Sequence, residues 1–255
     1  MVVGLIRGDD ETAYRDVVRQ LAAWCADNNL ALDTQKTKEI IVDFRHARSH
    51  THIPIYINGA VVERVSSFKI LGIHIPEDLT WSLNSSILIK KVQQRLYFLW
   101  SIKKAHLCPR ILTDFYRCTI ESILTNCISE WYGNCPVSDH KALQRVVKTA
   151  QQIIGTQLPT IENSYHKCCL GRAKSIIKDA FHPNHGLFTL LPSGRRYRSL
   201  RSHTSRHRKS FFPEAVTLLN LTSQRSAVLH PYWTVSVLLY LYAAALTFYL
   251  QLFCK

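Results

Sequence analysis

Residues 83–105 of the chain, LNSSILIKKVQQRLYFLWSIKKA, decide the fold of its second part. Apolar side chains recur through this stretch at helical spacing, which predicts one long helix. The same pattern, with each segment starting at or just after a proline, predicts three more helices at 109–131, 138–154 and 160–180. The second part of the chain is therefore expected to be helical.

The residues before this helix favour strands. Short apolar runs bounded by turn residues predict strands at 2–6, 39–44, 53–57, 60–65 and 68–75. Asn58-Gly59 suits a type I′ hairpin turn, because both residues tolerate positive φ. A helix is expected from Asp10, which would act as its N-cap. The predicted fold class is α+β, with one helix and a small antiparallel sheet ahead of the helical part.

Charge is divided unevenly along the chain. Residues 1–81 contain nine Lys/Arg and eleven Asp/Glu, whereas residues 82–255 contain 23 and seven. Such an excess of cations attracts polyanions, so nucleic acid or an anionic membrane surface is the expected partner, with a merely soluble basic surface as the alternative. Together with the change in pattern, this predicts four units: 1–81, 82–194, a basic arm at 195–225 and an apolar tail at 226–255.

Two segments near the C-terminus have unusual compositions. Residues 195–209 hold seven Lys/Arg and no acid, which predicts a flexible arm that contacts a polyanion, serves as a nuclear-import signal or is inert. Residues 232–254 contain no charge and are long enough to cross a bilayer, so a C-terminal transmembrane helix is one expectation and an insoluble tail the other.

The eight cysteines form no CxxC pair and no apolar leader precedes them, which favours reduced thiols in an intracellular, nuclear or membrane-anchored protein.

Several ordered blocks carry a family resemblance. They are Val2-Val3-Gly4-Leu5-Ile6, Trp24-Cys25-Ala26-Asp27-Asn28-Asn29-Leu30, Lys36-Thr37-Lys38-Glu39, Ser67-Phe68-Lys69-Ile70-Leu71-Gly72, Leu79-Thr80-Trp81-Ser82, Gln94-Arg95-Leu96-Tyr97-Phe98-Leu99 and Trp131-Tyr132-Gly133-Asn134-Cys135. In this order they resemble the palm and thumb of non-LTR (LINE-type) retrotransposon reverse transcriptases. The resemblance covers about residues 2–222.

This resemblance implies a truncated palm, then a basic helical thumb and a hydrophobic C-terminal helix. In that family the strand matching Val2–Ile6 follows a Phe/Tyr-Ala-Asp-Asp turn whose carboxylates hold two metal ions. Met1 stands at the position after that turn, so we expect no catalytic residue, no metal and no cofactor in this chain. The expected activity is residual binding of nucleic acid, either RNA or an RNA/DNA hybrid, with no small-molecule substrate.

The expected nucleic-acid contacts fall into three groups. By resemblance, Lys36 matches a palm lysine, and Lys69 with Gly72 matches the primer grip, for which plain strand packing is the alternative. Cations of the long predicted helix and of the basic arm complete the set: Lys90, Lys91, Arg95, Lys103, Lys104, Arg195, Arg196, Arg198, Arg201, Arg206, Arg208 and Lys209. Tyr97, Phe98 and Trp100 could stack on bases, but we expect them in the core.

Three other patterns suggest different chemistry. Gly8-Asp9-Asp10 copies a polymerase signature, although a helix start at Asp10 explains it better. Zinc-type ligands occur at His166, Cys168, Cys169, His182 and His185, yet Cys168 and Cys169 are adjacent, so buried thiols and loop histidines are expected instead. Residues 66–104 also resemble the N-terminal domain of alkylated DNA repair protein AlkB homologue 8, but no His is followed two positions later by an acid, as an iron dioxygenase requires.

Overall fold

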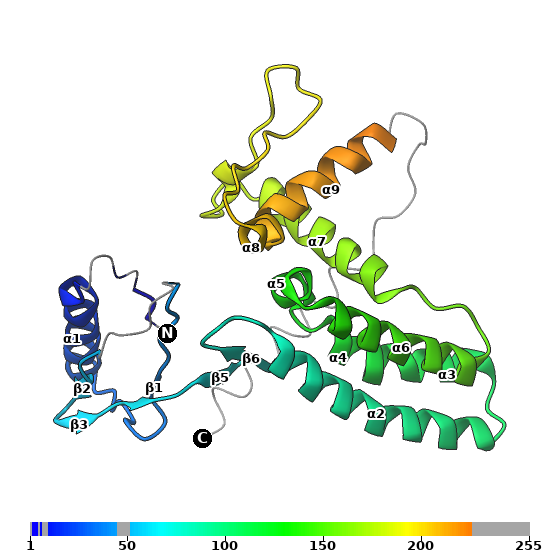
Figure 1. Ribbon diagram of the computed structural model, residues 1–255, viewed down its shortest axis with the longest axis horizontal. Coiled ribbons are helices and arrows are strands. Elements are labelled where there is room, and N and C mark those ends of the chain that lie inside the picture. The colour runs from blue at the N-terminus through cyan, green and yellow to red at the C-terminus, as the bar shows by residue number, and fades with distance from the viewer. Residues whose placement is uncertain (1, 5, 7–9, 45–51, 226–255) are drawn as a thin grey trace.

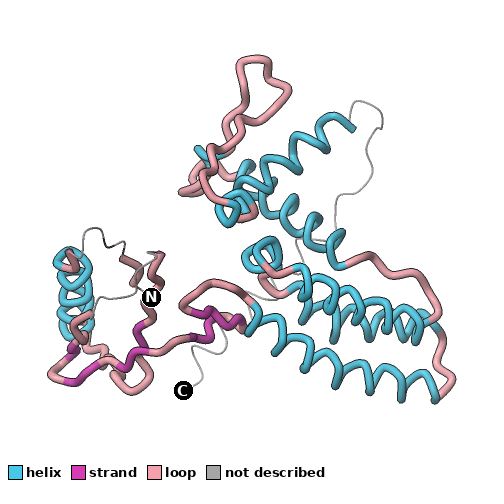
Figure 2. The backbone as a smooth tube through the Cα atoms, viewed as in Figure 1, coloured by secondary structure: helices cyan, strands magenta, loops and turns pink. Residues whose placement is uncertain are grey.

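The computed structural model describes residues 2–4, 6, 10–44 and 52–225. Helices dominate the second part of the chain and short strands the first, so the described fold is a mixed α+β one (Figures 1 and 2). The helical elements are α1 Thr12–Asp27, α2 Ser82–Lys104, α3 Pro109–Tyr116, the π-helix η1 Arg117–Glu121, α4 Ser122–Thr125, α5 Ile128–Trp131, η2 Tyr132–Asn134, α6 Val137–Ile154, α7 Ile161–Lys178, η3 His185–Leu187, α8 Ser205–Arg208 and α9 Phe211–Arg225. The strands are β1 Lys38–Glu39, β2 Tyr56–Ile57, β3 Ala60–Val61, β4 Glu63–Arg64, β5 Ser67–Ile70 and β6 Ile73–Pro76.

Helix α1 begins at Thr12, two residues after the predicted start, and the predicted N-cap, Asp10, is one residue too early. The Asp10 carboxylate accepts a hydrogen bond from the Thr12 backbone N–H at 3.0 Å, so it satisfies one of the free donors at the helix start. Glu11 occupies the N-cap position itself and makes no side-chain cap bond. Gly8 and Asp9 lie outside the described residues.

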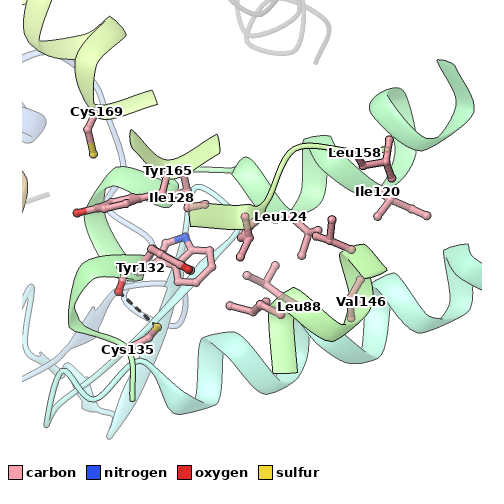
Figure 3. Close-up of a cluster of buried hydrophobic side chains, with 14 of the residues drawn as sticks. Leu88, Ile120, Leu124, Ile128, Tyr132, Cys135, Val146, Leu158, Tyr165 and Cys169 are labelled. Carbon is pink, nitrogen blue, oxygen red and sulfur yellow. Dashed lines mark hydrogen bonds between the residues drawn. The ribbon is translucent and has the colours of Figure 1, made fainter. Parts of the chain in front are cut away.

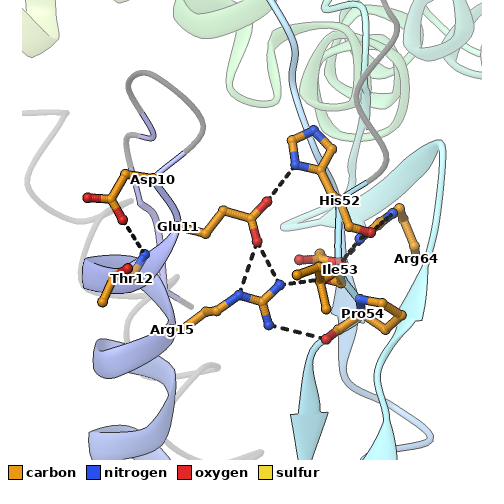
Figure 4. Close-up of polar contacts among 9 residues, drawn as sticks. Asp10, Glu11, Thr12, Arg15, His52, Ile53, Pro54 and Arg64 are labelled. Carbon is orange, nitrogen blue, oxygen red and sulfur yellow. Dashed lines mark hydrogen bonds and ion pairs between the residues drawn. The ribbon is translucent and has the colours of Figure 1, made fainter.

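A polar cluster joins the start of α1 to the segment before β2 (Figure 4). One Glu11 oxygen lies 2.6 Å from His52 Nδ1, and the other accepts from the Arg15 guanidinium at 2.6 Å. Arg15 also donates to the carbonyls of Ile53 and Pro54, at 2.6 and 3.2 Å. Below these contacts, a small apolar cluster packs the helix on the strands: Val18, Ile55, Ile57 and Val62.

The predicted single antiparallel sheet is corrected by the structure. The described strands form three two-stranded sheets, and one of them, β1 with β4, is parallel. The Asn58-Gly59 turn is confirmed: both residues have positive φ, 52° and 78°, and β2 pairs antiparallel with β3 across it. The strand predicted at 2–6 was wrong for the residues described there. The strand predicted at 39–44 was wrong except at Glu39, which belongs to β1.

The predicted strand at 68–75 is instead a hairpin of β5 and β6. Leu71 and Gly72 have positive φ, 49° and 84°, which turns the chain back on itself. The Asn126 side-chain amide donates to the Leu71 carbonyl at 3.1 Å and fixes this turn against the helices. Apolar period alone could not reveal the turn, since Leu71 is not a residue that favours positive φ.

The predicted helices are present with one division. The helix expected at 109–131 runs without interruption through α3, η1 and α4 and then breaks before α5, where Cys127 adopts positive φ (46°). Trp131 follows this break and is fully buried; its indole N–H donates to the Asn126 carbonyl at 3.0 Å. Leu88, Val146 and Cys169 come from α2, α6 and α7 and are buried in the same core (Figure 3).

Residues 195–225, the predicted basic arm, contain two helices, α8 and α9. Helix α9 occupies its second half and contributes buried side chains to the large core: Phe211, Ala215, Val216, Leu218 and Leu219. No helix in the described part of the chain is long and apolar enough to cross a membrane. The apolar segment 232–254 lies outside the described residues.

Candidate nucleic-acid interface

Helix α2 exposes a row of aromatic side chains. Tyr97, Phe98 and Trp100 are 64%, 48% and 43% accessible, so the expectation that they lie in the core was wrong. The reason is the helical period: the buried side of α2 is filled by Leu88, Val92 and Leu99, and the three aromatic residues fall outside that stripe. Large aromatic rings left in solvent are the kind of surface on which bases stack.

Cations lie over these rings. The Lys104 ammonium is 3.4 Å from the centre of the Trp100 ring, and the Arg95 guanidinium is 6.0 Å from that of Phe98. Tyr97 contacts both neighbouring rings, with centroids 6.0 Å from Phe98 and 6.3 Å from Trp100. The α2 aromatic row, as we call Arg95, Tyr97, Phe98, Trp100 and Lys104, therefore combines stacking faces with positive charge.

A first pocket, of about 470 Å³, lies between the β5–β6 turn and α2. Its lining consists of Gly72, Leu88, Lys91, Gln94, Arg95, Ser122, Ile123 and Asn126, and contains two cations and no acid. The fold thus brings Gly72 beside Lys91 and Arg95, three of the residues that sequence reasoning selected. This hairpin pocket has the donors and the positive charge that a phosphate group needs.

Lys69 belongs to the same positive region. The pKa of His74, which follows the turn, is lowered by burial and then by the charges of Lys69 and Lys91. Both lysines therefore act on one imidazole, and Lys69 is paired with His74 across the β5–β6 hairpin. The local field disfavours protonated His74 and favours an incoming anion.

A second pocket, of about 490 Å³, lies where the end of α2 meets α6. It is lined by Trp100, Lys103, Lys104, His106, Thr149, Gln152 and Ile153. Lys103 donates to the Gln152 carbonyl at 3.5 Å, which links the two helices. The cations of α2 are therefore divided between two sites. Lys91 and Arg95 line the hairpin pocket, whereas Lys103 and Lys104 line this second pocket, which we call the Trp100 pocket.

The other predicted contact residues lie away from these two pockets. Lys36 is exposed in the turn before β1, where its ammonium lies 3.2 Å from an Asp33 carboxylate oxygen. Lys90 is exposed on α2 but lines neither pocket. The cations of the basic arm are all exposed: Arg195, Arg196, Arg198, Arg201, Arg206, Arg208 and Lys209. Of these, Arg206 donates to the Asp78 carbonyl at 3.0 Å.

Sequence reasoning missed the uncharged lining of both pockets. Ser122 lies on α4, Asn126 in the turn after it, and Thr149 and Gln152 on α6; nothing in the local pattern of these residues marks them. Only the packing of α4 and α6 on α2 brings them to the site.

The residues described by the structure contain no group of three or more His, Cys, Asp and Glu that could hold a metal ion. Among the zinc-type candidates, Cys169 is fully buried, and burial raises the pKa of its thiol to about 12. The pKa of Cys168 is also raised by burial. His166 lies 3.9 Å from a Glu214 oxygen, while His185 Nδ1 is 3.3 Å from the Ile176 carbonyl oxygen.

Comparison with known families gives one match. A family model described as alkylated DNA repair protein alkB homolog 8, N-terminal, matches residues 81–122. The match covers α2, α3, η1 and the first residue of α4, and it overlaps residues 66–104, whose sequence resembles the same domain, at 81–104. No curated protein and no solved structure matches the chain.

Proposed function

We propose that this chain is a reverse-transcriptase-derived protein that binds single-stranded RNA or DNA along α2. The ordered sequence blocks described above support the origin, and the exposed α2 aromatic row supports the binding. In this proposal bases stack on Tyr97, Phe98 and Trp100, while the backbone phosphates contact Lys91 and Arg95 at the hairpin pocket.

The exposed aromatic row is the observation that carries the proposal. Tyr97, Phe98 and Trp100 are each about half exposed, which leaves in water apolar area that core packing would otherwise have used. Each stacked base contributes about 1–3 kcal/mol, and every base offers a ring face, so such a surface accepts many sequences. The adjacent cations add a salt-dependent contribution.

Fluorescence anisotropy with a labelled 12-nucleotide strand tests this function. Trp100→Ala and the double variant Tyr97→Ala/Phe98→Ala are each expected to weaken binding about tenfold. Trp24→Ala removes from α1 a tryptophan that is 55% accessible, against 43% for Trp100, and serves as the matched control, with unchanged affinity expected. Binding that is absent, or equally weakened by the control, would contradict the proposal.

The family match favours a second candidate, a protein related to the N-terminal segment of alkylated DNA repair protein alkB homolog 8. The matched residues 81–122 include α2, so both candidates place the same helix at the centre of function. The dioxygenase chemistry of that name requires His-x-Asp/Glu, and none of the 12 histidines has an acid two positions later. On this sequence the second candidate would therefore lack its iron site, and stoichiometric iron binding in a titration with Fe(II) would contradict that expectation.

A further inference from the structure

Residues 189–198 form a hairpin held by one β-bridge, and its second half lies in the segment that composition predicts to be a flexible arm. Leu190 pairs antiparallel with Tyr197. The Leu191 N–H donates to the Arg196 carbonyl and the Arg198 N–H to the Thr189 carbonyl, each at 2.8 Å. Gly194 closes the tip with φ of +66°. In Figure 1 this yellow hairpin projects away from the helices.

Asn220 of α9 holds the hairpin in place. Its side-chain oxygen accepts from the Tyr197 backbone N–H at 2.8 Å, and its amide donates to the Tyr197 carbonyl at 3.1 Å. The Tyr197 ring meets Phe188 edge to face, with centroids 6.5 Å apart. Two hydrogen bonds and one ring contact at a single residue give the hairpin a fixed direction, which a solvated basic tail lacks.

Strand alternation separates its two faces. Tyr197 points to the core, so Arg196 and Arg198, one residue to each side, belong to the opposite face. Both are exposed, as is Arg195 at the tip, and residues 189–198 contain no acid. The hairpin therefore presents arginines on the side turned away from the helices.

We propose that this basic hairpin is a β-ribbon that enters the major groove of duplex DNA, which extends the proposed nucleic-acid-binding function to a second, double-stranded ligand. Two paired strands with their side chains fit the roughly 12 Å width of the B-form major groove. The roughly 6 Å minor groove and the narrow major groove of A-form RNA are too small for them. Arginine also supplies the paired donors that contact guanine edges and phosphates there.

The test measures binding of the full chain to a labelled 16-base-pair DNA duplex over a range of NaCl concentrations. The double variant Arg196→Gln/Arg198→Gln is expected to weaken binding about tenfold and to lower the salt slope by about two. Arg201→Gln/Arg208→Gln removes the same charge outside the hairpin and is the matched control, with a several-fold smaller loss expected. Equal losses for the two pairs would mean diffuse attraction and overturn the proposal.

Asn220→Ala provides a variant that keeps every cation but releases the anchor. It is expected to weaken duplex binding several-fold with an unchanged far-ultraviolet circular dichroism spectrum, whereas unchanged affinity would show that hairpin direction does not matter. Double-stranded RNA of the same sequence should bind more weakly, and equal hairpin-dependent binding to it would exclude the major-groove mode. If the chain binds single strands but no duplex, the hairpin proposal is refuted and the proposed function of α2 stands. Loss of single-strand binding in Trp100→Ala tests α2 and leaves the hairpin proposal unaffected.

Discussion

The two parts of the molecule differ in how much core each has. The first part packs α1 on two-residue strands through Val18, Ile55, Ile57 and Val62. The helical part buries a far larger set of side chains, drawn from β6, α2 and every longer helix after it. The first part is also slightly acidic and the second strongly basic. Stability and nucleic-acid contact are therefore both expected to reside mainly in the helical part.

Among the substitutions considered, one in the core of the helical part should have the largest effect on stability. Leu99 on α2 is fully buried in the large core, so Leu99→Ala is expected to lower the free energy of unfolding by about 2–5 kcal/mol. Val62→Ala in the small cluster should cost less, because fewer atoms surround that side chain. Native-state hydrogen exchange resolves the two parts, and a larger loss of protection from Val62→Ala would reverse the proposed order.

The next largest effect on stability is expected from Arg172, because this residue of α7 contacts both α5 and α9. Its guanidinium pairs with Glu130 and donates to the Ser129 hydroxyl at 3.2 Å, both on α5, and it lies 4.4 Å from the Phe211 ring centre on α9. Arg172→Ala is expected to destabilise the helical part by about 1–2 kcal/mol in urea unfolding. Lys174→Ala, an exposed cation on the same helix, is the control and should leave the midpoint unchanged.

Acid should weaken the first part through Glu11. The hydrogen bond from His52 is the main cause that lowers the pKa of this carboxyl below its ordinary value of 4.5, and Arg15 adds to it. A lowered folded-state pKa gives stability that is present above pH 4.5 and is lost as the pH falls through the folded value. Hydrogen exchange at pH 7 and pH 4 should show that loss in α1, and Glu11→Gln should remove most of the pH dependence. An equal dependence in the variant would assign the effect to other groups.

The smallest effect is expected at Lys36. Its side chain is exposed and pairs only with Asp33 of its own turn among the contacts observed, so Lys36→Ala should change stability by less than about 0.5 kcal/mol. It should also leave affinity for single strands unchanged, whereas Lys91→Ala at the hairpin pocket should weaken it two- to fivefold. Comparable losses in anisotropy from both variants would mean that the first part also contacts nucleic acid.

Sequence reasoning succeeded where one local signal determined the structure. Helical spacing placed α2 and α6 to within two residues, and Asn58-Gly59 predicted a turn because the two residues themselves favour positive φ. It failed at Leu71 and Cys127, where packing imposes positive φ on residues that rarely adopt it. The pattern around 68–75 therefore looked like one strand.

The charged residues of the candidate site could be predicted from the sequence, but the exposure of its aromatic side chains could not. Lys91, Arg95 and Gly72 were selected from sequence, and the fold brings them to one pocket. Tyr97 and Trp100 were expected in the core, because apolar rings usually lie there and a single helix cannot show which of its sides is already filled. The hairpin at 189–198 was hidden for a related reason: its anchor, Asn220, lies on another helix.

Photo-crosslinking tests the central claim that α2 of the helical part holds the single strand. A 4-thiouridine-labelled RNA is irradiated with the full chain, and crosslinked tryptic peptides are identified by mass spectrometry. Cleavage after Arg95 and Lys103 isolates one peptide, 96–103, that contains Tyr97, Phe98 and Trp100. We expect this peptide to carry most of the crosslinked RNA; crosslinks confined to the first part of the chain, such as the peptide with Trp24, would mean that α2 does not hold the strand.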